Sequence, residues 1–595
     1  MVTYLPTRTP RKELVDVALG RVKADTIIKN VNLVNVNTKE VYESDIAIKG
    51  ERIALIGDAN HTQGRATKTI DGSNLFAIPG LIDGHIHVES TMMCVEEFSR
   101  VLVTRGTTCV NADLNETANV LGIRGFKLFY SRSSKMPLRI FLTAPSSIPL
   151  SKEEVEIPAN IIDLKDIREI IRMKNVFGLS EILSTADLLA CSKKLVKEVE
   201  IATQNGKYID GNAPSLMGRE LNAYIDGGPQ HDHEAVTAEE GMERLRLGMW
   251  VMLREGSSER NLPDISVILK DAKIDSRRCC FATDDKDAWD LANEGHIDHC
   301  LRKSVRLGIP ALTTIQMATI NCAEYLGVER DIGSISPGKM ADIVLVDDLE
   351  NFNVKRVLIG GQTVAENGKP TFDLKSTPYP KWAVNTVRPS RAVKQTDLRV
   401  PSPKNGKITV YVLDVSRGTI ISDMKTAELI AHDFSLESDL DQDVLKVVVV
   451  ERYGKTNLAI GKGFTRGFGL KSGALASSVA HCAHNIISVG TNDNDMVQAI
   501  NHVSRIQGGL VAVKDRKCVA EMQLNLAGIM SLEPWEKVSE KLDDINRVVQ
   551  SQLGCVLRSP YMVLSFETTA SVPELKVSTK GLIHASTMKN LPLFV

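Results

Sequence analysis

The middle of this 595-residue chain alternates short apolar segments with longer amphipathic ones. Continuous or alternating apolar residues over about four to eight positions favour strands, whereas apolar positions at helical spacing favour helices. Helices are predicted between eight strands, which lie at residues 81–88, 108–113, 138–144, 176–181, 207–211, 230–234, 250–255 and 279–284. Eight strand–helix units over about 250 residues predict a (β/α)8 barrel.

Two groups of short strand patterns flank the predicted barrel. The first lies within residues 24–78 and the second within residues 341–359, and turn residues separate the strands of each group. This arrangement predicts one small β domain whose strands come from both sides of an inserted domain. We therefore expect residues 1–78 and 336–371 to form a composite β domain, with the barrel at residues 79–335 between them.

The remaining sequence predicts a linker and a further domain. Residues 372–405 are rich in Pro, Ser and Lys and show little periodicity, which favours a linker. Residues 406–595 begin with strand patterns and continue with helix patterns, among them a short helix expected at residues 477–480. We expect a C-terminal α+β domain there, within an α/β fold class.

The composition narrows the class of protein. The chain is 43% hydrophobic and 25% charged with a formal net charge of -2, so no basic excess indicates nucleic acid. No apolar run reaches the about 20 residues that a membrane span needs. The ten cysteines are scattered without a Cys-x-x-Cys pair, and residues 1–14 carry charges without an apolar core. We expect a cytoplasmic protein with reduced thiols and no nucleic-acid or membrane partner.

Polar and ionisable residues follow the ends of the predicted strands, where barrel active sites are built. His85 and His87 share one face of the first strand, because side chains alternate along an extended strand, and two such imidazoles suit one metal ion. The other strand ends carry Asp113, Asn115 and Glu116; Ser146 and Ser147; Glu181; Asp210 and Asn212; His231 and His233; Arg254 and Glu255; Asp284 and Asp285. Singly, Glu181 could be a surface carboxylate and Asp284-Asp285 a helix N-cap. Together they supply the ligands and proton carriers of metal-assisted hydrolysis.

Several motifs resemble the adenine deaminase family of the amidohydrolase superfamily. In the barrel the similar segments are Pro79–Met92, Gly178–Glu181, Leu221–Ile225, Asp232–Glu234, Arg254–Ser257 and Thr283–Asp285. In the C-terminal part they are Gly469–Ala474, Ser477–His481, His484–Ile487, Val489–Asp493 and Pro592–Val595. The resemblance therefore covers nearly the whole chain. For His481 and His484 we prefer a structural role over a site near the barrel mouth.

This resemblance implies a metal-dependent hydrolase barrel that converts adenine and water to hypoxanthine and ammonia. The family's metal ligands fall on His85, His87, Glu181, His233 and Asp284, with Glu181 bridging two metals. We expect catalytic roles for Asp284, Glu181, Glu116 and Asp113, and substrate contacts from Glu89, Ser90 and Arg254. The expected cofactor is Mn2+, with Fe2+ or Zn2+ as alternatives, at one or two ions per chain. The expected partner is a small purine, and a homo-oligomer is allowed for.

The sequence departs from the family at two expected histidines. Asn115 replaces the histidine of an Asp-Pro-His-Glu motif, and Asn212 replaces the metal-binding histidine of Asp-Gly-His-Ala-Pro. An amide oxygen is a weaker ligand for a transition metal than an imidazole. His231 is a histidine that the family pattern does not lead us to expect. It either replaces the lost metal ligand in part or packs inside the barrel, and we prefer the second interpretation.

Three functions stay open at this point. The chain is an adenine deaminase with a weakened or mononuclear site, a deaminase of a related aminopurine, or a degenerate amidohydrolase-like binder. The retained Glu181, His233 and Asp284 argue against degeneration, whereas Asn115 and Asn212 keep it open. Metal content would separate the binder from the enzymes, and a panel of substrates would separate the two enzymes.

Overall fold

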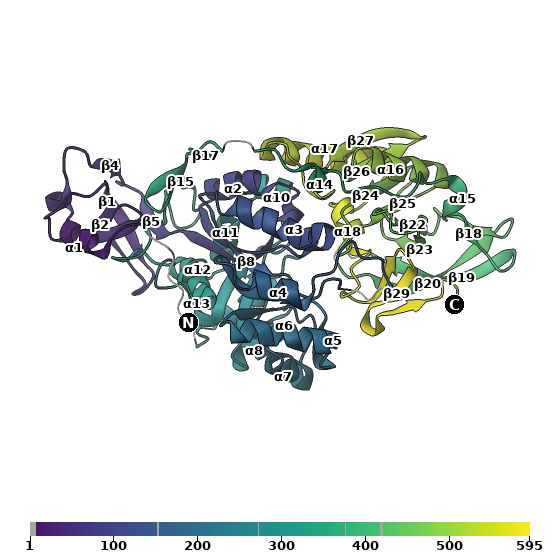
Figure 1. The fold of residues 1–595 in the computed structure, drawn as a ribbon, viewed down its shortest axis with the longest axis horizontal. Helices are drawn as coiled ribbons and strands as arrows, with labels where there is room; N and C mark the ends of the chain where they lie inside the picture. Colours follow the sequence, from purple (N-terminus) through teal and green to yellow (C-terminus); the bar gives the residue numbers. More distant parts are fainter. Residues whose placement is uncertain (1–7, 151–153, 272, 375–376, 417–419) are drawn as a thin grey trace.

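The computed structural model describes residues 8–150, 154–271, 273–374, 377–416 and 420–595. Of the N-terminal segment that predicted no secretory signal, residues 1–7 lie outside these ranges. The molecule is elongated, with a small β domain at one end, the barrel in the middle and the C-terminal domain at the other end (Figure 1).

The central barrel is built from eight parallel strands, as the sequence predicts. They are β6 (Leu81–His87), β7 (Thr107–Asp113), β8 (Arg139–Ala144), β9 (Val176–Ile182), β10 (Tyr208–Gly211), β11 (His231–Asp232), β12 (Trp250–Arg254) and β13 (Cys279–Ala282). Their pairing runs β10-β9-β8-β7-β6 in one sheet and β11-β12-β13 in a second. β10 lies beside β11, and a parallel bridge between Ile86 and Asp284 joins the first strand to the end of the last. The carboxyl ends of all eight strands therefore meet at one mouth.

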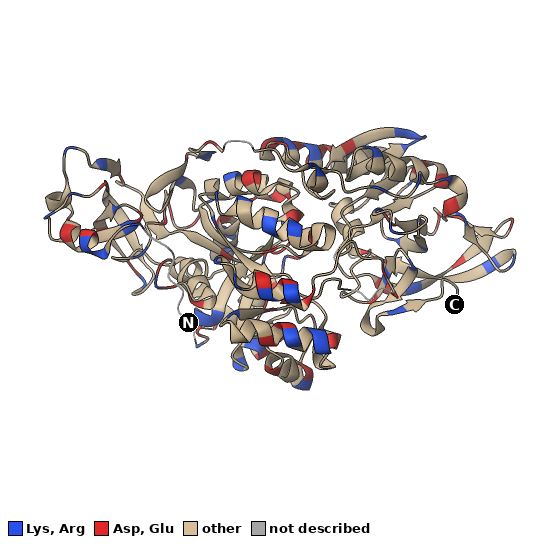
Figure 2. Ribbon diagram, viewed as in Figure 1, with Lys and Arg blue, Asp and Glu red and all other residues tan. Residues whose placement is uncertain are grey.

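Amphipathic helices surround the barrel and bury one face against it. They are α2 (Val95–Thr104), α3 (Asn115–Ser133), α4 (Leu164–Ile170), α5 (Thr185–Leu189), α6 (Lys193–Gln204), α7 (Gly218–Asp226), α8 (Ala238–Arg246), α9 (Leu262–Ser266), α10 (Ala288–Asn293), α11 (Ile297–Arg306), α12 (Ala311–Met317) and α13 (Ile320–Leu326). Local sequence fixes some of their starts. A capping box formed by Thr237 and Glu240 begins α8, for example. Charges of both signs are interspersed along the helices (Figure 2).

The small β domain is composite, which confirms the prediction from the two flanking strand groups. Its elements are α1 (Arg11–Ala18), β1 (Thr26–Asn35), β2 (Glu40–Lys49), β3 (Arg52–Gly57), β4 (Lys68–Asp71), β5 (Phe76–Pro79), β14 (Ile343–Val346), β15 (Val354–Ile359), β16 (Gln362–Glu366) and β17 (Lys369–Pro370). Antiparallel pairing of β14 with β5 closes the domain, with Ile343 opposite Pro79. The strand β6 follows directly, so this sheet anchors the start of the barrel.

The C-terminal domain contains a mixed sheet of eight strands in the order β20-β19-β23-β22-β25-β24-β26-β27. The described part of segment 372–405, expected as a linker, forms α14 (Lys381–Val384), α15 (Gln395–Leu398) and β18 (Val400–Pro401), and it packs on this sheet through the buried Val387, Val393 and Leu398. The other elements of the domain are β19 (Gly406–Asp414), β20 (Asp423–Ala431), β21 (Ser435–Leu436), β22 (Leu445–Val450), β23 (Ile460–Arg466), β24 (Ala474–Ser477), β25 (Ile486–Gly490), α16 (Asp493–Arg505), β26 (Gly509–Lys514), β27 (Lys517–Gln523), α17 (Trp535–Leu553), α18 (Pro560–Phe566), β28 (Leu575–Ser578), β29 (Gly581–His584) and β30 (Lys589–Leu591). The helix predicted at residues 477–480 is wrong. Ser477 pairs with Ile487 and Leu510 as the last residue of β24, so the sheet holds its backbone extended.

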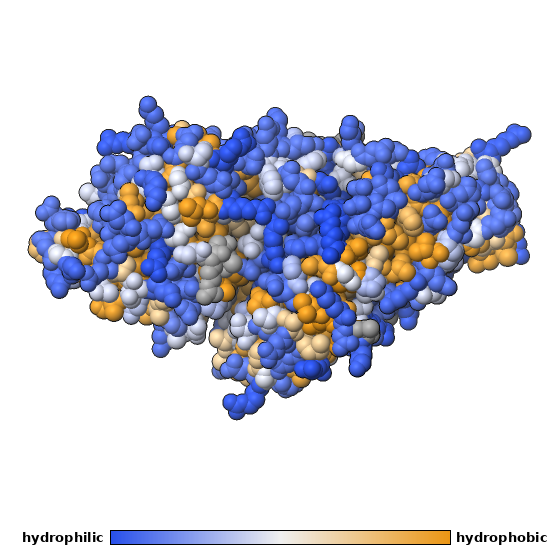
Figure 3. All heavy atoms as spheres, turned by 180° about the vertical axis from the view of Figure 1, so that it is seen from behind, coloured by the Kyte–Doolittle hydropathy of each residue, from blue (hydrophilic) through white to orange (hydrophobic). Residues whose placement is uncertain are grey.

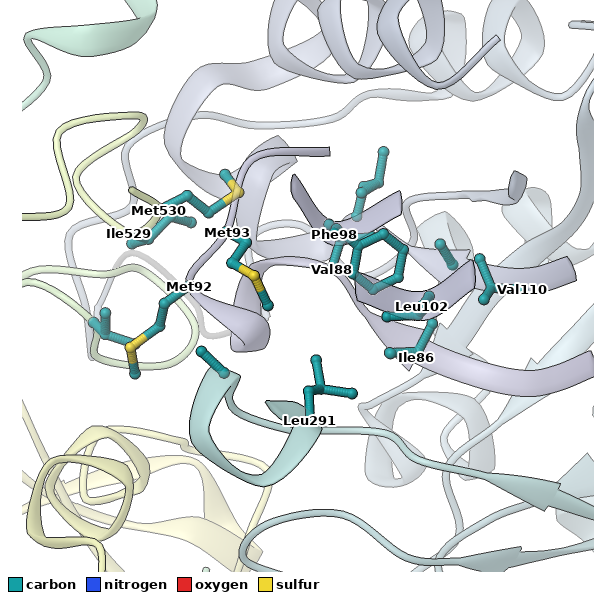
Figure 4. Close-up of a cluster of buried hydrophobic side chains, with 14 of the residues drawn as sticks. Ile86, Val88, Met92, Met93, Phe98, Leu102, Val110, Leu291, Ile529 and Met530 are labelled. Atoms are coloured by element: carbon teal, nitrogen blue, oxygen red, sulfur yellow. The ribbon is translucent and has the colours of Figure 1, made fainter. Parts of the chain in front are cut away.

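Apolar side chains join the C-terminal domain to the barrel. Met92 and Met93, just after β6, lie beside Ile529 and Met530 of the C-terminal domain (Figure 4). All four are buried, and Met93 bridges to Ser531 through the backbone. The outer surface is mainly hydrophilic with small hydrophobic patches on the face shown in Figure 3. Among the described helices, none has the length and apolar character needed to cross a membrane.

Candidate metal-dependent active site

Four buried donor atoms converge at the barrel mouth. His85 Nε2 lies 3.3 Å from His87 Nε2, and His87 Nε2 lies 3.1 Å from Glu181 Oε1. Asp284 Oδ1 lies 3.4 Å from His87 Nε2 and 3.8 Å from His85 Nε2. Tetrahedral donors at about 2.1 Å from a metal stand about 3.4 Å apart. The three distances from His87 Nε2 to the other donors match this spacing, which suits a divalent cation among these groups.

Carboxylates on the far side of the two imidazole rings orient the rings toward the proposed metal position. His85 Nδ1 lies 2.9 Å from Asp210 Oδ2, and His87 Nδ1 lies 3.3 Å from Glu116 Oε2. Carboxylates in this position fix the tautomer and the ring orientation of a metal-binding histidine. Asp284 is held in turn, because Arg254 Nη1 donates to its Oδ2 at 2.9 Å. Its Oδ1 is left facing His85 and His87.

His231 packs inside the barrel, below the converging donors. Its Nδ1 lies 2.9 Å from Asp210 Oδ1, and its Nε2 lies 3.2 Å from the hydroxyl of Tyr325. Both ring nitrogens thus have partners away from the mouth. His231 does not replace the lost ligand, and it supports Asp210 behind His85 instead.

A second group of polar atoms lies beside Glu181. His233 Nε2 lies 3.4 Å from Glu181 Oε2, and Asn212 Nδ2 donates to the same oxygen at 2.7 Å. Asn212 Nδ2 also donates to Glu234 Oε1 at 3.0 Å. Arg254 Nη2 lies 3.0 Å from the other oxygen of Glu234. The structure thus gathers all five predicted metal ligands, and it adds Asn212 and Glu234 between two of them.

A cavity opens from these groups and is lined by both domains. From the barrel come His87, Glu116, Glu181, Arg254 and Asp284, and from the C-terminal domain come His481, Cys482, Phe566 and Thr569. His481 Nδ1 lies 3.4 Å from Glu116 Oε1, and its ring stacks on Phe566 at 4.7 Å between centroids. Our preference for a purely structural His481 was therefore wrong. The motif Ser477–His481 could have identified His481 as a site residue from the sequence. No sequence motif marked Phe566 or Thr569.

Three predicted site residues hold neighbours in place and are not among the described residues that line this cavity. Asp113 accepts hydrogen bonds from the backbone N–H groups of Asn115 at 3.1 Å and Glu181 at 3.3 Å. Glu89 Oε1 accepts from the backbone N–H of Thr117 at 2.8 Å. The hydroxyl of Ser90 donates to Asp285.

Burial and neighbouring charges shift the pKa values of the carboxyl groups around the cavity in different directions. Burial opposes the charge of Glu116, but the imidazoles of His87 and His481 outweigh burial and hold the pKa of Glu116 well below its ordinary value. Burial raises the pKa of Asp285, and the charge of Asp284 raises this pKa further. Burial and then the charge of Glu116 raise the pKa of Glu89 to about 7. Neighbouring carboxyl groups of one site thus have pKa values shifted in opposite directions.

The chain is similar in sequence to two family models and to curated proteins. A model described as "Amidohydrolase family" matches residues 76–364, and one described as "Adenine deaminase C-terminal domain" matches residues 419–589. A curated protein from Dehalococcoides mccartyi named adenine deaminase is 37% identical, over 98% of this chain and 99% of that protein. One of the same name from Archaeoglobus fulgidus is 38% identical, over 98% of each chain. A solved structure of molinate hydrolase, at 16% identity and a TM-score of 0.45, covers 60% of this chain and 98% of that chain.

Proposed function

This chain belongs to the adenine deaminase family of the amidohydrolases and deaminates adenine to hypoxanthine and ammonia, and we propose that it does so in the cavity at its barrel mouth. The observation that supports this location is the convergence of His85, His87, Glu181 and Asp284, with spacings that suit one divalent cation. The family is metal-dependent, and the buried donors offer what such a cation needs.

We assign the metal ligands to the predicted residues and expect Mn2+ as the metal. Imidazole and carboxylate donors together suit Mn2+, and also Fe2+ or Zn2+ as alternatives. A divalent cation held there lowers the pKa of water and so supplies a nucleophile at neutral pH. Asp210 and Glu116 fix the orientation of His85 and His87, as described above.

The chain's own carboxylates move the protons of the reaction. Water adds to C6 of adenine, and one of its protons passes to the ring nitrogen N1. The proton that remains on the C6 hydroxyl passes to the exocyclic amine, which leaves as ammonia while C6 becomes the carbonyl of hypoxanthine. We expect Asp284, which Arg254 orients at its Oδ2, to take a proton from the attacking water as well as to bind the metal. Glu116 lines the cavity and is placed to carry protons to the purine. Asp113 accepts a hydrogen bond from the backbone N–H of Glu181, and Arg254 donates to Asp284. Glu89 and Ser90 bind the neighbouring Thr117 and Asp285.

The C-terminal domain supplies an aromatic wall of the cavity, and such a wall suits a small planar substrate. His481 and Phe566 stack on each other at the cavity wall. Aromatic faces of this kind pack well against flat heteroaromatic rings. We expect them to contact the purine and to limit the entry of water.

The test is adenine turnover by the full chain, with hypoxanthine detected and bound metal counted. The E116Q variant keeps the metal ligands and should lose about 100- to 10,000-fold in kcat, the usual contribution of a general acid–base group. The D284N variant should lose both turnover and tight metal binding. The matched control is D543N, which alters an exposed carboxylate on α17 and should leave both unchanged. Full activity of D284N or E116Q would contradict these roles.

A further inference from the structure

We infer that this chain holds one metal ion, because the Asn212 side-chain amide takes the place of a second cation between Glu181 and Glu234. The inference rests on the proposed function and concerns the metal count of the same site. The family resemblance implies a site in which Glu181 bridges two metals. The hydrogen bonds of Asn212 disagree with that arrangement.

The first metal position is intact. Its donors come from His85, His87, Glu181 and Asp284, and His87 Nε2 lies 3.1 to 3.4 Å from each of the other three. Glu181 contributes only its Oε1 to this group. Its Oε2 is the oxygen that would have to reach a second metal.

Asn212 engages that oxygen instead. Its amide nitrogen donates to Glu181 Oε2 at 2.7 Å and to Glu234 Oε1 at 3.0 Å, which uses both hydrogens of the amide. An imidazole nitrogen with a free lone pair at this position would face two carboxylate oxygens and would need a cation between them. The neutral amide meets the same two oxygens as a donor, so no cation is needed there.

The remaining donors near the second position are already engaged by other groups. The negative charge of Glu234 is already balanced at its other oxygen, Oε2, because Arg254 Nη2 lies 3.0 Å from it. His231 is turned toward Asp210 and Tyr325, so it adds no ligand. Around the His233 imidazole lie Glu181 Oε2 at 3.4 Å and Glu234 Oε1 at 3.7 Å, and Asn212 already donates to both oxygens. His85 and Asp284 also lie near His233, but their Nε2 and Oδ1 atoms face His87 at the first position. Protein metal sites usually offer about three or four protein donors.

The decisive experiment counts manganese in the full-length protein. Metal is removed with a chelator, excess Mn2+ is added and unbound Mn2+ is washed out, and elemental analysis is combined with electron paramagnetic resonance. We expect one ion per chain and the spectrum of an isolated Mn2+. N212H restores an imidazole, and N212D replaces the donor with a carboxylate oxygen. Both should double the bound manganese and give the spectrum of an exchange-coupled pair.

N115H is the matched control, because it restores the other family histidine at a side chain that contacts Ser180 rather than Glu181 or Glu234. It should stay at one ion. Two ions in the unmodified chain would overturn the inference. A folded N212D variant that still binds one manganese ion would also overturn it. The N212D result decides the metal count even if N212H fails to fold. Adenine turnover, measured on the same samples, separates the two ideas: one bound ion without turnover contradicts the proposed function and leaves the metal count standing.

Discussion

Glu198 is a buried carboxylate on α6 whose surroundings do not fully support its charge. The residue is 1% exposed, and its Oε2 accepts a hydrogen bond of 3.4 Å from the backbone N–H of Ser147. Lys194 Nζ lies 3.6 Å from its Oε1, beyond hydrogen-bond distance. Burial raises the pKa of Glu198 from 4.5 to about 6, and Lys194 only partly opposes this. Folding therefore favours the protonated form of Glu198 relative to the unfolded chain.

The variant E198Q should stabilise the protein in a pH-dependent way. With the folded pKa raised, the contribution of Glu198 to stability is fully present below pH 4.5 and is lost as the pH rises through about 6. A shift of this size corresponds to about 2 kcal/mol. The melting temperature of E198Q should exceed that of the unmodified chain at pH 8 and match it near pH 4.5. E200Q, on the exposed part of the same helix, is the control. An equal difference at both pH values would contradict this account.

At the scale of elements, the sequence predicts the barrel strands well because each is buried on both faces. Such strands are continuous apolar runs, and polar residues begin only where a strand ends at the mouth. The same reasoning fails at Ser477, where pairing with two neighbouring strands decides the backbone and local propensity does not. The position of α18 was also beyond sequence reasoning. Phe566 reaches the cavity only because the C-terminal domain packs over the barrel.

The helix α17 depends on the glycine that ends it. Gly554 has a φ of +82°, in the left-handed region, and a Cβ there would lie 2.8 Å from Lys471 Cγ. Gly206, after α6, has a φ of +66° with open space around the same position. An alanine in the left-handed region costs about 1 kcal/mol. G206A should show only this cost, and G554A should lower the melting temperature further because Lys471 must move. Equal effects of the two variants would contradict the role assigned to Lys471.

At the scale of the whole molecule, the site depends on two domains that share one apolar core. The barrel supplies the metal donors and the C-terminal domain supplies the cavity wall of His481 and Phe566. Lys455 Nζ also donates to the backbone carbonyls of Pro158 at 2.7 Å and Ala159 at 2.6 Å across the boundary. The sequence identifies the metal donors because motifs mark them. It does not predict the wall or the hydrogen bonds of Asn212, because those arise from tertiary contacts.

Two exposed cysteines allow this shared core to be tested. Among the described cysteines, Cys191 lies on the barrel and Cys518 on β27 of the C-terminal domain, and both are exposed. A C518S variant labelled with a fluorophore at Cys191 reports the barrel, and a C191S variant labelled at Cys518 reports the C-terminal domain. Both labels should show the same melting temperature, because buried Met93 and Met530 belong to one apolar cluster.

Mn2+ should raise the melting temperature at both labels by the same amount, although its donors belong only to the barrel. A ligand that binds only the folded state at about 100 times its Kd stabilises that state by about 2.7 kcal/mol. If the two domains unfold as one cooperative unit, this stabilisation reaches Cys518 in full. D284N, without one metal donor, should lose the shift at both labels. A shift confined to Cys191 would mean that the C-terminal domain unfolds independently, and the cavity wall would then open without loss of the metal site.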